Sequence, residues 1–269
     1  MDKYSTKEWQ QLCHLVKQLV PQELGQESWY LIIAATLVTS PDPELLASFY
    51  AHVTTHNPDF ASEEAKRRLS ERFRDVLLKL TTLVGAPRVL CAVMPLAKAE
   101  GDVQAKAKCA KLKDKWHTDQ LNMAAIYDRG VRRMDQIYGS SLLPKVFDSY
   151  GTHKEDLKFN EFFAVYGLYL SDLEVMTSLE TEAVVFTSIS CLGLKSPGAW
   201  HFRGMGRLLL ASRGKDEPRD ITTQLGNLKD AVIGVVKFVG GEFVHTSKCE
   251  QWATVEDIEN QLGGWGLDD

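Results

Sequence analysis

The sequence has no Cys-x-x-Cys pair and no long hydrophobic run. Its five cysteines are odd in number and scattered along the chain, at Cys13, Cys91, Cys109, Cys191 and Cys249. This spacing argues against a zinc ribbon or a thioredoxin-type redox motif, and it is typical of reduced thiols in a reducing compartment. The longest apolar stretch, residues 30–38, is far too short to cross a bilayer.

Recognisable targeting signals are also missing. The N-terminal residues, MDKYSTKEWQQLC, carry acids and no long apolar core, so we expect neither a secretory signal nor an Arg-rich transit peptide. The C-terminal residues, GGWGLDD, are not a peroxisomal Ser-Lys-Leu address. We therefore expect an intracellular protein, cytoplasmic by default, with a mitochondrial or peroxisomal location left open.

Strong charge of either sign is absent as well. The net charge is −5, which suggests neither nucleic acid nor an anionic membrane as a partner. A run of lysines near residues 106–115 is interpreted as a solvated helix or linker, with an anionic partner as the alternative. Apolar residues make up 44% of the chain, enough for a proper core.

Helical periodicity dominates the chain, and strand-like alternation is nearly absent, so we predict an all-α fold. Ser62 and Thr254 are expected to cap helices, and the Ser196-Pro197 pair is expected to begin one. The predicted helices cover residues 6–20, 28–38, 43–52, 62–84, 88–98, 119–138, 141–149, 155–169, 172–192, 196–212, 220–239 and 254–262.

An internal repeat is visible at an offset of 155 residues. Glu27 and Glu182 are each expected to begin a buried helix, and Gly85 and Gly240 are each expected to close a long helix. Two matches at one offset, with the same order of elements, favour a duplication.

The polar stretch at 100–118 suggests a boundary between the two units. We predict a degenerate N-terminal helical repeat over 1–110 and a second helical repeat over 111–269.

The second repeat contains an acid and a histidine on consecutive predicted helices, Glu182 and His201. A histidine oriented by a carboxylate can take a proton next to a carbonyl or pass one to a leaving group. Gly204 and Gly206 follow His201 and indicate close helix packing or room for a ligand. An antiparallel pairing of the two helices is expected to put Glu182 and His201 at opposite ends of the hairpin, so their contact depends on the crossing geometry.

The spacing Glu182–x18–His201, the preceding YGLYLSDLEVMTSLETE and the closing VGGEF resemble the carboxymuconolactone decarboxylase and alkylhydroperoxidase D-like superfamily. The first-half segment RLSERFRDVLLKLTTLVGAPRVLCAV is similar to fungal members with two such regions. The resemblance covers about residues 27–98 and 119–243. It implies a duplicated alkylhydroperoxidase D-like helical bundle, oligomers built by helix packing, and decarboxylation of a lactone acid or reduction of hydroperoxides by a Cys-x-x-Cys pair.

The chain departs from that family at the reactive cysteines. The two family positions, twelve and fifteen residues after the glutamate, are here Leu194 and Pro197. Cys191 is the only thiol nearby, and a dithiol cycle needs a resolving cysteine, so we regard dithiol peroxidase activity as lost. The first-half position that matches His201 is near Leu46, without a histidine within five residues, so the first repeat is interpreted as scaffold.

Each of the candidate residues also has a purely structural interpretation. Glu182 and His201 can form a buried pair that fixes helix register, and Glu180 is the second-ranked acid for His201. Trp200 can wall a pocket or fill the core, and Cys191 is expected to pack as a small apolar residue. Arg203 can bind a carboxylate, but a surface or cap role is favoured.

The leading functional hypothesis is proton transfer on a small organic acid or lactone, with His201 as base and Glu182 as its orienting carboxylate. The alternatives are an eroded scaffold or interaction protein of the same fold, and a hydroperoxide-handling protein that uses Cys191 alone. We expect a small-molecule ligand, a homo-oligomer, and neither a metal nor a cofactor.

Overall fold

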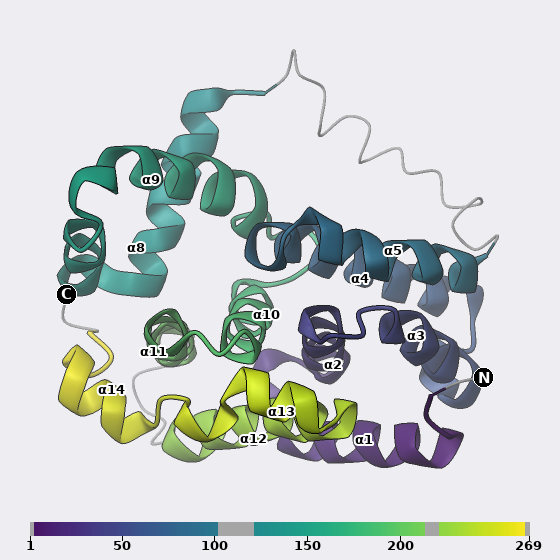
Figure 1. Cartoon of the computed structure of the whole chain (residues 1–269). Coiled ribbons are helices and arrows are strands. Elements are labelled where there is room, and N and C mark those ends of the chain that lie inside the picture. The colour runs from purple at the N-terminus through teal and green to yellow at the C-terminus, as the bar shows by residue number, and fades with distance from the viewer. Residues whose placement is uncertain (1–2, 102–120, 213–220, 267–269) are drawn as a thin grey trace.

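The computed structural model describes residues 3–101, 121–212 and 221–266, and this part of the chain is all-α, without a strand (Figure 1). The predicted fold class is therefore confirmed. The α-helices are α1 (Thr6–Leu19), α2 (Ser28–Thr39), α3 (Leu45–His56), α4 (Glu63–Val84), α5 (Ala86–Glu100), α8 (Met123–Asp148), α9 (Lys154–Asn160), α10 (Ser178–Cys191), α11 (Lys195–Ala211), α12 (Ile221–Val239), α13 (Gly241–Ser247) and α14 (Val255–Leu262). Short 3₁₀ turns occur at Gln22–Leu24, Pro58–Phe60, Gly151–His153 and Cys249–Gln251, and a π-helix, η4, covers Glu161–Leu170.

Local capping residues begin several of these helices as the sequence predicts. The Ser62 side chain accepts a hydrogen bond from the Ala65 N–H at 3.1 Å at the start of α4. Thr254 and Asp257 form a reciprocal capping box at the start of α14. Both satisfy backbone donors that a helix leaves unpaired in its first turn.

Other predicted boundaries are wrong. The helix predicted over 172–192 begins only at Ser178, the start of α10. Ser196 is not an N-cap, because α11 begins one residue earlier, at Lys195, after Leu194. The helices predicted over 119–138 and 141–149 form a single element, α8, interrupted at Gly139, whose φ of 71° lies in the region that favours glycine.

Two helices, α2 and α10, lie side by side at the centre of the molecule (Figure 1). Every residue of α2 is buried, and almost every residue of α10. Because both helices are buried over almost their whole length, both are covered on all sides, and the acidic side chains of α10 find their partners inside the protein. The other helices provide that cover, including α1, which packs against α12 from the opposite end of the chain.

The larger hydrophobic core is continuous from Trp9 to Ile258 and uses residues from both parts of the chain. A second core cluster joins α8 and η4 to α10 through Val185 and Ile189. The predicted boundary near residue 110 and the lysine run at 106–115 both lie outside the described residues.

None of the helices in the described ranges is both long enough and apolar enough to span a membrane.

Candidate functional site

The structure brings Glu182 and His201 into direct contact. His201 Nδ1 lies 2.7 Å from Glu182 Oε1. A carboxylate can only accept a hydrogen bond, so Nδ1 carries a proton, and whenever the ring holds a single proton Nε2 is its acceptor nitrogen. Both residues are buried, with 2% of His201 and 1% of Glu182 exposed.

The expected separation of the two residues at opposite ends of the hairpin is wrong. Glu182 lies nine residues before the end of α10 at Cys191, and His201 lies six residues after the start of α11 at Lys195. At a rise of about 1.5 Å per residue, these distances from the connecting turn are similar. Antiparallel packing therefore places the two side chains at nearly the same height.

Gly204 allows α11 to approach α8 and α10 closely. A Cβ added at Gly204 would lie 2.6 Å from Ile137 Cγ2 and 2.9 Å from Glu182 Oε1. The prediction of close packing at this glycine is confirmed. Gly206 plays the same part against the Trp265 ring, where an added Cβ would fall 2.2 Å from ring atoms.

Two tyrosine hydroxyls surround the other ring nitrogen of His201. Tyr138, from α8, has its hydroxyl oxygen 3.2 Å from Nε2, and Tyr166, from η4, has its oxygen 3.4 Å away. The two hydroxyls are 3.0 Å from each other. Two phenol groups, an imidazole and a carboxyl thus form one connected polar cluster inside the apolar second core.

The Tyr138 backbone is held by Arg203. The positive φ of Gly139 interrupts α8 directly after Tyr138, and the Tyr138 carbonyl accepts a 2.7 Å bond from Arg203 Nη1. Arg203 Nε donates to the Gly264 carbonyl at 2.7 Å. A surface position for Arg203 is therefore wrong, since the side chain is fully buried and ties the kink in α8 to the C-terminal segment.

Arg133 adds a buried positive charge to the cluster. Its Nη2 lies 3.9 Å from Glu182 Oε2, the oxygen that His201 does not use. Nη2 also donates to the Ser178 carbonyl at 3.0 Å, and Nη1 donates to the Ser178 hydroxyl. The guanidinium is thus anchored at the start of α10, where its charge attracts the Glu182 carboxylate.

Burial shifts the acid–base behaviour of the groups around the histidine. It raises the pKa of the Tyr138 phenol and that of the Tyr166 phenol well above the ordinary value, so both stay protonated near neutral pH. Burial also raises the pKa of Glu161, an effect that the nearby His201 partly offsets.

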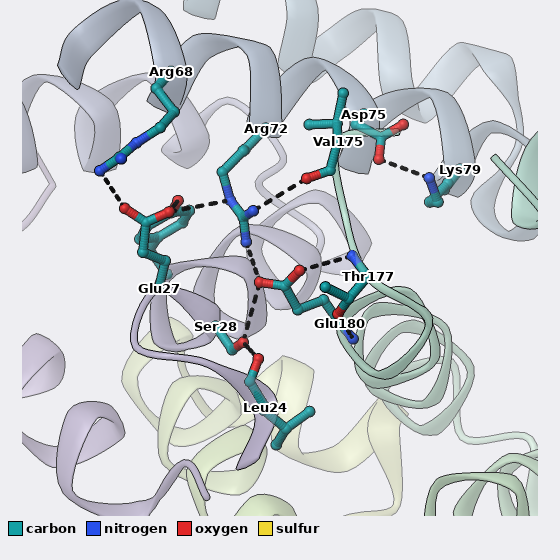
Figure 2. Close-up of polar contacts among 11 residues, drawn as sticks. Leu24, Glu27, Ser28, Arg68, Arg72, Asp75, Lys79, Val175, Thr177 and Glu180 are labelled. Atoms are coloured by element: carbon teal, nitrogen blue, oxygen red, sulfur yellow. Dashed lines mark hydrogen bonds and ion pairs between the residues drawn. The ribbon is translucent and has the colours of Figure 1, made fainter. Parts of the chain in front are cut away.

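The second-ranked acid, Glu180, does not contact His201. It lies in the capping box at the start of α10, where its carboxylate accepts from the Thr177 N–H at 2.8 Å. Its other oxygen pairs with Arg72 of α4, a residue 108 positions earlier (Figure 2). Glu180 therefore belongs to a contact between α4 and α10.

Figure 2 shows Arg72 at the centre of that contact. Its Nη1 donates to the Val175 carbonyl at 3.2 Å, and its Nε lies 3.9 Å from Glu27 Oε2. Arg68 pairs with the other oxygen of Glu27. The acid that matches Glu182 in the proposed repeat is thus paired with arginine instead of histidine.

Cys191 and Trp200 occupy different environments. Cys191 is buried, and burial raises the pKa of its thiol well above the ordinary value despite a hydrogen bond with Thr36. Trp200 is half-buried, and its ring meets the Tyr138 ring edge-on at a centroid distance of 6.4 Å. Trp200 also lines a 90 Å³ cleft between α11 and α14, together with Lys195, Ser196, Ala199, Ala253, Asp257, Gln261 and Leu262.

Arg133 and Tyr138 were not identified from the sequence as members of the cluster. The three-residue spacing of Tyr166 and Tyr169 predicts core positions for both, and Tyr166 is buried, whereas Tyr169 is half-buried. The one local signal was the Tyr138-Gly139 pair at the end of a predicted helix, because a glycine that interrupts a helix fixes the position of the residue before it.

In the described ranges, no group of three or more histidine, cysteine or acidic side chains is placed to hold a metal ion. No protein-family model matches the chain, and no curated protein and no solved structure matches it.

Proposed function

We propose that this protein transfers protons on a small organic acid or lactone, in the manner of a carboxymuconolactone decarboxylase-like enzyme, with His201 as base and Glu182 as its orienting carboxylate. The observation that carries this proposal is the 2.7 Å contact of His201 Nδ1 with Glu182, which leaves Nε2 as the basic nitrogen. The carboxylate also stabilises the imidazolium that forms when Nε2 takes a proton.

The order of the helices supports a duplicated bundle as the framework of this site. Gly85 follows α4 and Gly240 follows α12, at the offset of 155 residues, and both have positive φ, of 82° and 134°. The two fully covered helices, α2 and α10, begin 150 residues apart and end 152 residues apart, close to that offset. We propose that the first unit is a scaffold, because its matching acid, Glu27, is paired with Arg68.

A scaffold function for the whole chain is the second candidate. It is favoured by the burial of the cluster, in which Tyr138 and Tyr166 are 5% and 3% exposed. A buried pair satisfied on all sides fixes helix register whether or not it reacts. A single-cysteine peroxidase is the weakest candidate, because the raised pKa of Cys191 opposes formation of the thiolate.

We also propose that the chain forms a homo-oligomer in a reducing compartment. Leu90 and Met94 of α5 are 55% and 60% exposed and lie one helical turn apart, which suits a contact between copies. Sedimentation of the chain with Leu90→Glu and Met94→Glu together is expected to show a smaller species than the unmodified chain.

The enzymatic proposal is tested by ligand-induced thermal shifts with a panel of small carboxylic acids and lactones. The unmodified chain is compared with two variants of the site, His201→Ala and His201→Gln. The Gln variant keeps a buried hydrogen-bond donor near Glu182. The control is His245→Ala, at an exposed position of α13. A ligand at this site raises the melting temperature of the chain and of the control, by mass action, and not that of the His201 variants.

Turnover of a compound that shifts the melting temperature, with loss of turnover in His201→Gln, would complete the case for an enzyme. If no compound shifts the unmodified chain, or if all four proteins respond alike, the scaffold function replaces the enzymatic one.

A further inference from the structure

His201 Nε2 and the hydroxyls of Tyr138 and Tyr166 make three mutual contacts, and these cannot all be hydrogen bonds at once. Tyr138, Tyr166 and Nε2 lie within 3.0 to 3.4 Å of one another, but the two hydroxyls supply only two protons. With Nε2 unprotonated, one hydroxyl donates to the other, and the second donates to Nε2. The shorter contact to Nε2 is that of Tyr138, at 3.2 Å, so Tyr138 is the better donor to the ring.

We propose that Tyr138 is the proton relay of the site, the group through which His201 Nε2 exchanges protons with a ligand or with solvent. This inference rests on the proposed function for its catalytic meaning. It follows from the geometry, because Nε2 is enclosed by hydroxyls and His201 itself is buried. A ligand proton therefore reaches the base through a hydroxyl group.

The proton balance of the relay is simple. The Tyr138 oxygen accepts the proton of the ligand while its own hydroxyl proton moves to Nε2. The products are the conjugate base of the ligand, a neutral tyrosine and an imidazolium held by Glu182. Tyr138 never becomes a phenolate, in keeping with the burial that raises its pKa.

Two contacts distinguish Tyr138 from Tyr166 as the outer member of the pair. The Tyr138 carbonyl is bound by Arg203 beside the break at Gly139, which fixes the position of its ring. The Tyr138 ring also meets Trp200, which lines the 90 Å³ cleft between α11 and α14. Trp200 thus contacts the Tyr138 ring and also lines this cleft, so the cleft is the nearest described opening on the Tyr138 side of the pair.

Several charged groups act on the ring from the elements packed around it. Glu182 of α10 stabilises the imidazolium, whereas Arg133 of α8 opposes it, and Glu161 of η4 adds a negative charge nearby. These charges act on the protonated form of the ring. The hydroxyl of Tyr138 provides the route by which its Nε2 proton is exchanged.

The test is an NMR measurement on the full chain with ¹⁵N- and ¹³C-labelled histidine. Relaxation dispersion at the pH of half-protonation gives the rate at which the His201 ring gains and loses its Nε2 proton. Tyr138→Phe is expected to slow that rate by about tenfold or more, since a positioned acid–base group contributes about 10² to 10⁴-fold. Tyr127→Phe, a half-buried tyrosine of α8 away from the histidine, is the control and is expected to leave the rate unchanged.

Two results would overturn the relay: an equal exchange rate in Tyr138→Phe and the unmodified chain, or a His201 ring that stays unprotonated between about pH 5 and 8. If Tyr138→Phe does not fold, 3-fluorotyrosine in the full chain provides the second test. Its more acidic hydroxyls are expected to move the Nε2 resonance further toward that of a hydrogen-bonded nitrogen, and an unmoved resonance contradicts the proposal. None of these measurements needs a ligand, so failure of the relay is separate from failure of the thermal-shift panel.

Discussion

Burial, more than residue type, sets the chemistry of single side chains in this protein. Cys191 and Cys91 are both free thiols, but Cys191 is packed in the core and Cys91 is exposed on α5. Glu182 and Glu180 are both buried acids two residues apart, yet one is paired with histidine and the other with arginine. Neighbours from distant parts of the sequence give identical residues different roles.

At the residue scale we predict that Cys191 is inert. The thiolate is the reactive form, and burial raises the pKa of this thiol far from neutral. Labelling with a chromogenic disulfide at about pH 7 is expected to be fast at Cys91 and to reach Cys191 only on unfolding. Cys91→Ser should therefore remove the fast phase that mass spectrometry assigns to Cys91, and a fast phase assigned to Cys191 would contradict the prediction.

Glu161 gives a prediction on pH dependence. Its pKa in the folded chain is raised above the ordinary value of 4.5, so the folded state holds this proton more tightly than the unfolded state. Its contribution to stability is therefore favourable in acid and falls as the pH rises through 4.5 toward the raised value.

Replacing the Glu161 carboxyl with a neutral amide should remove the destabilisation that its ionised form causes near neutral pH. Glu161→Gln is expected to be more stable than the unmodified chain at about pH 7, with the difference shrinking as the pH falls to about 4. Urea unfolding at both pH values measures it, and Glu155→Gln, at an exposed position of α9, is the control. A constant difference between the two pH values would show that the shift in pKa is not the cause.

At the scale of elements, glycines decide how closely α11 approaches its neighbours. Gly204→Ala puts a methyl group against Ile137 and Glu182, so we expect a loss of about 1–3 kcal/mol of stability from overpacking. The matched control is Gly226→Ala in α12, where nothing lies within 4 Å of an added Cβ. That change is expected to stabilise the chain by about 0.5–1 kcal/mol through helix propensity.

Chemical denaturation of both glycine variants measures the contrast. The Gly204 variant should also perturb the His201 ring resonances, because its added Cβ meets the Glu182 carboxylate. Similar stabilities for the two variants would mean that α10 and α11 separate easily, in conflict with a fixed Glu182–His201 contact.

At the scale of the whole molecule, α4 and α10 are joined by the ion pair of Arg72 with Glu180, whose side chains are 10% and 7% exposed. Removing one partner of a buried pair costs about 3–5 kcal/mol, because the other charge remains buried. Glu180→Gln keeps the capping box, which accepts Gln as well as Glu, and so removes the charge alone. We expect a destabilisation of about 3 kcal/mol.

The control for this variant is Asp148→Asn, which breaks the exposed pair with Lys154 and should change the stability little. Guanidinium unfolding of both variants gives the comparison. If the two variants lose the same small amount of stability, the apolar core alone holds α4 against α10.

The sequence alone determined the all-α class, most helix ranges and the caps at Ser62 and Thr254, because hydrophobic period and capping act within a turn or two of the chain. It also selected Glu182 and His201, which lie on consecutive helices. Only the tertiary structure decided which side chains face them. Tyr138 is 63 residues from His201, Arg72 is 108 residues from Glu180, and buried Arg203 binds two distant carbonyls. Such partners depend on how helices pack, and local periodicity carries no information about that packing.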